Sequence, residues 1–290
     1  MSTEIRKAIH ALGRNFDNEL LQGTIGLFAD KAPRPTPDLC TVERDIAYGY
    51  DERHRLDVFK PANGGSDLPV VVFVHGGGFV GGDKGAEGAP FYNNVGAWAV
   101  ANGCVGVTMT YRLAPTHQWP TGAQDIASAL IWIFANIANY GGDPRRVFLM
   151  GQSAGACHVA SYVAMPRLHP DGPPIRGALM LSGVYDLVTL PVHTDLEKAY
   201  YGTDARRFLE MSTLEGLVNS RIPCLYTVSE LDLPNFLQQA MVLVERYMAV
   251  RGHWPRLLFL PNQNHISPVM QLGCPSDTLG AELLAFIHMQ

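Results

Sequence analysis

Short apolar runs rich in β-branched residues alternate along this chain with longer stretches of helical spacing. This alternation is typical of a largely parallel sheet whose strands are joined by helices, so it restricts the fold to the α/β class. Strands are predicted at residues 70–75, 105–110, 147–151, 177–181, 223–228 and 256–260, and helices at 121–139, 153–165, 234–251 and 276–288. The last helix is expected to begin after Pro275, with Ser276 as its N-cap.

Other segments lie outside this alternation. Residues 42–48 and 55–60 are predicted to form two antiparallel strands that lead into the sheet. Residues 1–30 are predicted to be a helical segment of one or two amphipathic helices, and residues 187–220 interrupt the pattern between two strands. We expect both to cover the sheet as a small cap. Because no internal repeat or long linker is apparent, residues 1–290 are predicted to form a single domain.

The composition excludes several classes of protein. Of 290 residues 47% are hydrophobic and 17% are charged, as in a compact globular chain. The formal charge of -5 comes without a basic run, which disfavours nucleic acid and anionic membranes as partners. The five cysteines form no Cys-x-x-Cys pair, so neither a disulfide framework nor a metal site is expected. Without a signal-like or membrane-spanning run, the predicted location is cytoplasmic.

A Gly-Gln-Ser-Ala-Gly sequence occupies residues 151–155, where a predicted strand ends and a predicted helix begins. A nucleophile elbow requires this context, because its turn exposes the serine above the end of the sheet. Side chains at Gly151 and Gly155 would clash with neighbouring backbone in so sharp a turn. The pattern predicts Ser153 as a nucleophile. The alternative is an ordinary strand-to-helix turn.

A histidine followed by three glycines, residues 75–78, stands at the end of the first buried strand. Acyl transfer needs backbone N–H groups where a tetrahedral oxyanion forms, and consecutive glycines let the backbone approach that closely. The predicted oxyanion-hole donors are the N–H groups of Gly77, Gly78 and Ala154. A phosphate-binding loop is the alternative, but the chain lacks the Lys-Ser/Thr of a P-loop here.

The order of residues along the chain selects the partners of Ser153. In folds with a nucleophile elbow, the acid and then the histidine follow the serine along the chain, each in a loop beyond a strand. His265 lies in a loop just after a late predicted strand, so it is the predicted general base. Asp232 is the predicted acid that orients His265, and Glu230 in the same loop is the alternative. The other histidines after Ser153 are expected outside the site: His158, His169, His193, His253 and His288.

With these motifs the chain resembles the α/β-hydrolase fold of the hormone-sensitive-lipase-like carboxylesterase family. The resemblance begins at about Thr41 and rests on residues 75–79, Tyr111 to Pro115, Trp119-Pro120 with Asp125, Gly142 to Pro144, residues 151–155, Asp232 and His265. It implies a catalytic triad of Ser153, Asp232 and His265, the same oxyanion hole, and no cofactor. The implied substrates are carboxylic esters with short or medium acyl chains.

Two departures from the pattern of this family affect which substrate is expected. Thr116 stands where the family usually has Glu, and residues 48–50, 56–58 and 82–84 are similar to arylformamidases. Ester and amide cleavage use the same catalytic groups, so a kynurenine-formamidase-like amidase is the alternative to a carboxylesterase. A non-catalytic ligand-binding protein on the same fold is the alternative of another class.

An apolar or aromatic substrate pocket is expected beside the predicted catalytic residues. Core packing is the alternative for each of its predicted members. The N-terminal helical segment is expected to help close the site, and the patterns leave a homodimer open. The predicted substrate-binding residues are Phe79, Val80, Leu187, Tyr200, Tyr201, Leu233, Phe236 and Ile266.

Overall fold

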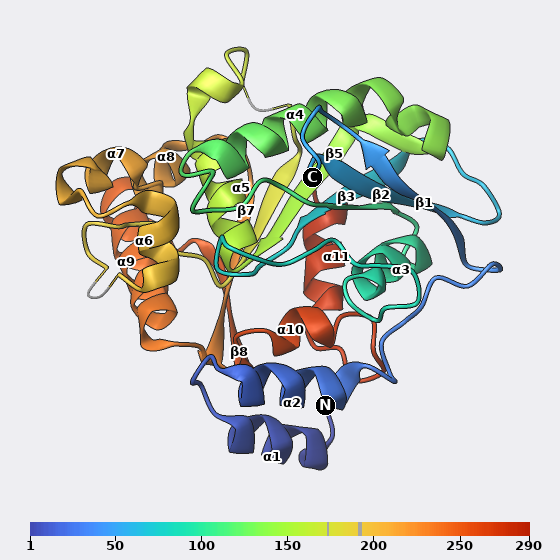
Figure 1. Ribbon diagram of the computed structural model, residues 1–290, viewed down its shortest axis with the longest axis horizontal. Coiled ribbons are helices and arrows are strands. Elements are labelled where there is room, and N and C mark those ends of the chain that lie inside the picture. The colour runs from blue at the N-terminus through green and yellow to red at the C-terminus, as the bar shows by residue number, and fades with distance from the viewer. Residues whose placement is uncertain (173, 191–192) are drawn as a thin grey trace.

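The computed structural model describes residues 1–172, 174–190 and 193–290. In these residues one sheet of eight strands runs through the molecule, in the order β1-β2-β4-β3-β5-β6-β7-β8 (Figure 1). β1 pairs with β2 and β2 with β4 in antiparallel register, and every pair from β4 to β8 is parallel. The strands are β1 (Cys40–Ala47), β2 (Arg55–Pro61), β3 (Leu68–Val74), β4 (Val105–Met109), β5 (Gly142–Gln152), β6 (Gly177–Leu181), β7 (Cys224–Leu231) and β8 (Arg256–Asn264).

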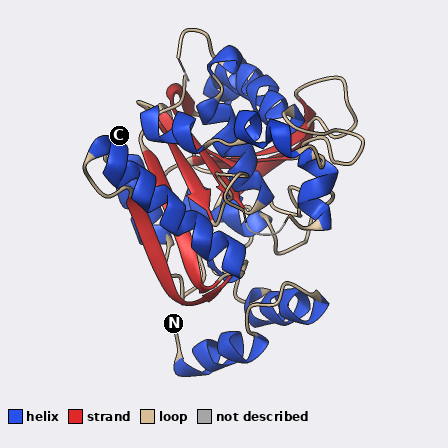
Figure 2. Ribbon diagram, turned by 90° about the vertical axis from the view of Figure 1, so that its left-hand side faces the viewer, coloured by secondary structure: helices blue, strands red, loops and turns tan. Residues whose placement is uncertain are grey.

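Helices cover both faces of this sheet (Figures 1 and 2). The described α-helices are α1 (Thr3–Leu12), α2 (Asn18–Phe28), α3 (Asn93–Ala101), α4 (Thr121–Asn136), α5 (Ala154–Ala164), α6 (Asp195–Tyr201), α7 (Phe208–Met211), α8 (Leu214–Asn219), α9 (Pro234–Arg251), α10 (Ser267–Met270) and α11 (Gly280–His288). Short 3-10 helices follow α4 at Ile137–Tyr140, α5 at Pro166–Leu168 and α6 at Ala205–Arg207.

The buried strand β3 explains the two apolar layers. Its side chains alternate between the faces of the sheet, as in any extended strand. Val70, Val72 and Val74 pack in the layer that contains the apolar side chains of α4 and α5. Val71 and Phe73 pack in the opposite layer with residues of α3 and α11. A strand buried on both faces reads as a continuous apolar run, which is why this part of the fold was predictable.

The predicted N-terminal helical segment forms the two helices α1 and α2, which stand together at one end of the sheet (Figure 2). The side chain of Ser2 caps α1 and that of Asp17 caps α2. Apolar residues of both helices pack against Ile266 and Met270, close to the end of β8. The packing therefore brings the start of the chain beside the loop that carries His265.

The predicted cap segment 187–220 contributes α6, α7 and α8 between β6 and β7. Residues 191 and 192 of this segment lie outside the described residues. α6 begins with a capping box. The Glu197 backbone N–H donates to the Thr194 hydroxyl oxygen, and the Thr194 backbone N–H donates to the Glu197 carboxylate. Tyr200 and Tyr201 at the end of α6 are buried in the core.

The predicted strands and helices are confirmed in their order and place, but β5 begins earlier, at Gly142, β8 ends later, at Asn264, and two helices differ further. The last helix begins at Gly280 rather than near Ser276, because the Asp277 carboxylate accepts the N–H groups of Leu279 and Gly280. α3 was not predicted, since nearly all of its side chains are buried and its sequence lacks an amphipathic period.

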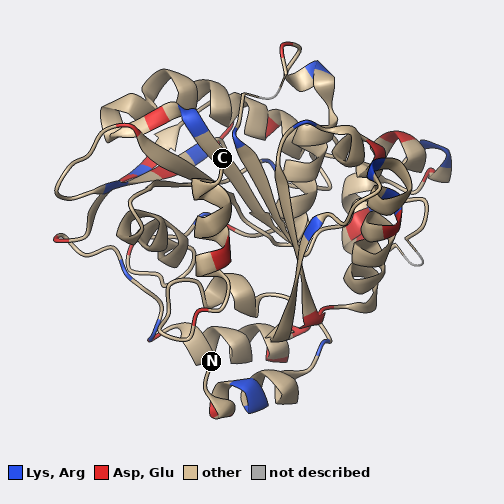
Figure 3. Cartoon of the chain, turned by 180° about the vertical axis from the view of Figure 1, so that it is seen from behind, with Lys and Arg blue, Asp and Glu red and all other residues tan. Residues whose placement is uncertain are grey.

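Seen from behind, Lys and Arg lie among Asp and Glu over the outer helices and loops (Figure 3).

Candidate active site

Ser153 lies in the sharp turn between β5 and α5. Its backbone has φ 55° and ψ -121°, a conformation that costs a non-glycine residue about 1–3 kcal/mol. A Cβ added at Gly155 would lie 2.1 Å from the carbonyl oxygen of Val74, and one added at Gly151 would lie 2.3 Å from the carbonyl oxygen of Gly155. The flanking glycines are therefore required by the close approach of the backbone.

The three predicted catalytic side chains are hydrogen-bonded in series. The Ser153 hydroxyl lies 2.8 Å from Nε2 of His265, and Nδ1 of His265 lies 2.6 Å from Oδ1 of Asp232. Because the carboxylate can only accept, Nδ1 carries the proton and Nε2 is free to accept the Ser153 hydroxyl. This arrangement lets His265 remove a proton from Ser153.

Asp232 is fully buried and has a partner on each oxygen. Its Oδ2 accepts the Ser182 hydroxyl at 2.7 Å and the Ser229 backbone N–H at 2.6 Å. Sequence reasoning missed Ser182, which comes from the end of β6, because no spacing relates it to Asp232. The alternative acid, Glu230, instead accepts the backbone N–H of Asn262 at 2.7 Å.

His158 illustrates why a nearby histidine is not equivalent to His265. It lies on α5 behind Ser153, among the rings of Phe79, Tyr111 and Tyr200. Both of its ring nitrogens are buried, and neither has a hydrogen-bond partner among the described residues. Burial lowers the pKa of His158 to about 3, so His158 is a weak base.

The glycine loop after β3 faces the same space as Ser153. Gly77 and Gly78 have φ values of 128° and 58°, which side-chain-bearing residues rarely adopt. Both glycines line the cavity that contains Ser153, as does Ala154. Ala154 is the first residue of α5, where the backbone N–H groups lack a partner within the helix.

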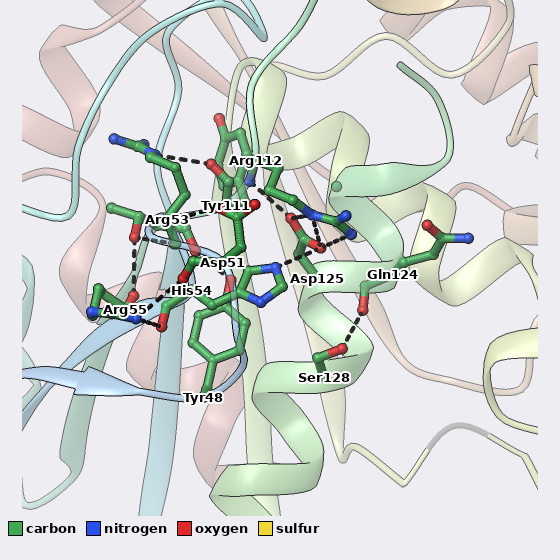
Figure 4. Close-up of polar contacts among 12 residues, drawn as sticks. Tyr48, Asp51, Arg53, His54, Arg55, Tyr111, Arg112, Gln124, Asp125 and Ser128 are labelled. Carbon is green, nitrogen blue, oxygen red and sulfur yellow. Dashed lines mark hydrogen bonds and ion pairs between the residues drawn. The ribbon is translucent and has the colours of Figure 1, made fainter. Parts of the chain in front are cut away.

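An ionic network surrounds the buried Asp125 carboxylate, next to Tyr111 (Figure 4). The Asp125 carboxylate on α4 accepts the Arg112 backbone N–H at 2.8 Å and its guanidinium at 2.6 Å, and it lies 3.1 Å from Nε2 of His54. Next to Arg112, the Tyr111 hydroxyl donates to the carbonyl oxygen of His75 at 2.8 Å. The motif residues from 111 to 125 therefore anchor the strand end from which the glycine loop departs.

A cavity of about 380 Å³ opens beside Ser153 and His265. Of the predicted substrate-binding residues, Phe79, Leu233, Phe236 and Ile266 line it. A second, open depression of about 620 Å³ lies over the Asp125 network, among residues that include His54, Arg112 and Ser128. Ser153 and His265 do not border that depression, so the smaller cavity is the candidate substrate site.

The other four predicted substrate-binding residues are not among those that line the cavity, so their role in binding stays a prediction. Tyr200 and Tyr201 lie behind its wall, where the Tyr200 ring stacks on Phe79 with centroids 4.6 Å apart. Leu187 is buried in the core, and Val80 is partly exposed outside the cavity.

Several cavity residues were not predicted. Phe16, in the turn between α1 and α2, meets the His265 ring edge-on with centroids 5.5 Å apart. Nothing in the local sequence signals a contact between the two ends of the chain. The remaining lining residues that sequence reasoning missed are Leu21, Tyr92, Cys157, Val184, Thr194, Leu196, Glu197, Asn235 and Met270.

Comparisons with known proteins agree with this geometry. The BD-FAE family model matches residues 56–170. Solved structures of similar shape include the hyperthermophilic esterase from the archaeon Pyrobaculum calidifontis, with TM-score 0.76 and 20% identity over 100% of this chain and 98% of that one. Esterase B from Lactobacillus rhamnosis gives TM-score 0.76 and 18% identity over 99% and 96% of the two chains. The chain has the α/β-hydrolase fold.

Curated relatives of this chain include carboxylesterases. Carboxylesterase NlhH of Mycobacterium tuberculosis is 35% identical over 144 residues, 49% of this chain and 43% of the relative. Probable carboxylesterase 1 of Arabidopsis thaliana is 32% identical over 165 residues, 51% of each chain. The alignments thus span about half the length of these relatives. The predicted resemblance to hormone-sensitive-lipase-like carboxylesterases is confirmed.

Two further findings concern the described part of the chain. In the part of the chain that the structure describes, no helix is both long and apolar enough to cross a membrane. Among the same residues, no group of three or more His, Cys, Asp and Glu side chains is arranged to hold a metal ion.

Proposed function

We propose that this protein is a serine hydrolase that cleaves carboxylic esters of short or medium acyl chains. The observation that carries the proposal is the hydrogen-bonded series Ser153–His265–Asp232 at the wall of an apolar cavity. A serine whose hydroxyl meets a histidine oriented by a carboxylate is the arrangement of an activated nucleophile. The similarity to carboxylesterases favours esters as the substrates.

The reaction proceeds through an acyl-enzyme. His265 takes the proton of Ser153 as the oxygen attacks the ester carbonyl, and Asp232 stabilises the imidazolium that results. The N–H groups of Gly77, Gly78 and Ala154 stabilise the oxyanion. His265 then protonates the departing alcohol, and a water molecule that the same histidine deprotonates releases the acid.

The two segments outside the sheet complete the substrate site in this proposal. Phe16 and Leu21 come from residues 1–30, and Leu196 comes from residues 187–220, and all three line the cavity. We assign both segments to a small cap on a single hydrolase domain. The cavity volume of about 380 Å³ supports short or medium acyl chains as the preferred substrates.

The proposed function is tested by a substrate series with the purified protein. We expect kcat/KM for p-nitrophenyl esters to be highest between acetate and octanoate and to fall for longer chains, because an apolar pocket of fixed size gains from each added methylene only until it is full. N-Formylkynurenine is measured alongside to test the arylformamidase alternative. Absence of ester turnover together with absence of fluorophosphonate labelling would favour the non-catalytic ligand-binding alternative.

Replacing Phe16 with alanine is expected to raise KM for the longer esters by about five- to tenfold and to leave p-nitrophenyl acetate almost unaffected. The Phe16 side chain is 45% exposed, so its removal costs little stability, but it removes apolar contact area from the cavity wall next to His265. Asn15→Ala, an exposed neighbour in the same turn, is the control. An equal rise in KM for acetate and octanoate would contradict a role in chain-length preference.

A further inference from the structure

The candidate substrate cavity contains a buried carboxylate that the proposed reaction does not use. In the described part of the chain, Glu197 is the one acidic residue in its wall, which is otherwise formed mainly by apolar side chains and glycines. The Glu197 residue is 6% exposed. It therefore adds negative charge to a site that has little other charge.

The position of Glu197 is fixed by α6. A Cβ at Gly78 would lie 2.6 Å from the Leu196 side chain, so the residue before Glu197 touches the proposed oxyanion loop. At the other end of α6, Tyr200 stacks on Phe79 from the same loop. These two contacts hold Glu197 beside the reacting groups.

The partners of Glu197 within the protein do not neutralise it. Its Oε2 accepts the Thr194 backbone N–H at 2.7 Å. Among the described residues, Thr194 is its hydrogen-bonding partner and no Lys or Arg forms an ion pair with it. Burial raises the pKa of Glu197, and the hydrogen bonds from Thr194 and the nearby His193 ring oppose this only in part.

The capping box explains the hydrogen bond but not the charge. Glutamine serves equally well at this position of a capping box, since its side-chain oxygen also accepts the N-cap N–H. A buried carboxylate carries a desolvation cost that a neutral amide avoids, unless a cation approaches it. A substrate whose cationic group enters the cavity would supply that cation.

We propose that Glu197 makes the site selective for esters that carry a cationic group, such as an alkylammonium, away from the scissile bond. The proposal rests on the proposed ester hydrolysis. The cationic group would replace the lost hydration of the carboxylate, whereas an uncharged group of the same shape would leave Glu197 unpaired.

The test compares two matched pairs of esters. In one pair the head group ends the acyl chain, and in the other it ends the alcohol. Within each pair, one ester carries a trimethylammonium group and the other its uncharged tert-butyl isostere. We expect the wild type to favour the cationic member of at least one pair by tenfold or more in kcat/KM, as a close charge pair in a partly desolvated site permits. Glu197→Gln should bring that ratio close to one.

Asp195→Asn is the matched control. It removes the same charge from the same first turn of α6, but the Asp195 side chain is 98% exposed and does not line the cavity. It should leave the cationic preference unchanged. Competitive inhibition of p-nitrophenyl acetate hydrolysis by non-reactive chains with the same two head groups gives a readout that does not depend on turnover of the bulky esters.

Failure of this inference is distinguishable from failure of the proposed function. A wild type that hydrolyses p-nitrophenyl acetate but does not discriminate the head groups, or a Glu197→Gln variant that keeps the preference, overturns the role of Glu197 alone. A protein that hydrolyses neither p-nitrophenyl acetate nor any ester of the pairs overturns the hydrolase proposal, on which the inference rests.

Discussion

Replacing Ser153 with alanine is expected to lower kcat for p-nitrophenyl butyrate by about five orders of magnitude. The Ser153 hydroxyl is the group that meets Nε2 of His265, so the variant loses the atom that forms the acyl-enzyme. The Cys157 thiol also lines the cavity, but burial raises its pKa to about 12, which keeps it a protonated and poor nucleophile. It should not substitute for the missing hydroxyl.

Ser161→Ala is the control for Ser153→Ala. Ser161 is another buried serine of α5, and its hydroxyl has no partner among the described residues. The control should keep wild-type kcat and should react with a fluorophosphonate as detected by intact mass, whereas Ser153→Ala should not react. Thermal unfolding midpoints within a few degrees of each other would establish that both variants are folded. A Ser153→Ala variant with kcat within tenfold of the wild type would refute the assignment.

The reacting residues were predictable because their signals are local. Ser153 follows from a strand, a tight turn with obligatory glycines, and a helix, all within a few residues. Asp232 and His265 follow from chain order and from the loops after two late strands. Such signals need no knowledge of how distant segments pack, since the ends of parallel strands meet at one edge of the sheet.

The substrate cavity was predicted poorly because its wall depends on packing between distant segments. Phe16 reaches His265 only because α1 and α2 dock beside β8 and α10. Tyr200 was expected in the cavity, yet it faces the core because the Phe79 ring occupies the intervening space. Glu197 was not predicted, because its place in the wall depends on how α6 packs against the glycine loop.

The sheet was predicted well for a physical reason that does not extend to α3. Strands buried on both faces are marked by short β-branched runs between Gly and Pro, and β6 and α9 have the predicted bounds at Gly177–Leu181 and Pro234–Arg251. α3 is buried on nearly every side and consists largely of small residues and Asn. Its sequence therefore has neither the alternation of a strand nor the stripe of a surface helix.

Replacing Asp232 with asparagine is expected to lower kcat by about 10⁴-fold, with little change in KM. Ser182 and the Ser229 N–H both donate to Oδ2, so the oxygen of an asparagine would occupy that position and its NH₂ group would face His265. Nδ1 of His265 would then have to accept, which moves the ring proton to Nε2. A histidine with a proton on Nε2 cannot accept the Ser153 proton, although the site keeps its shape.

Two matched variants decide whether this reasoning holds. Ser182→Ala removes one hydrogen bond to Asp232 but leaves its charge and its bond to His265, so we expect a loss of about tenfold or less. Glu230→Gln should be nearly as active as the wild type, because Glu230 bonds the Asn262 backbone instead of His265. If Asp232→Asn loses less than tenfold while Glu230→Gln loses several orders of magnitude, then Glu230 is the acid and His265 must turn to meet it during the reaction.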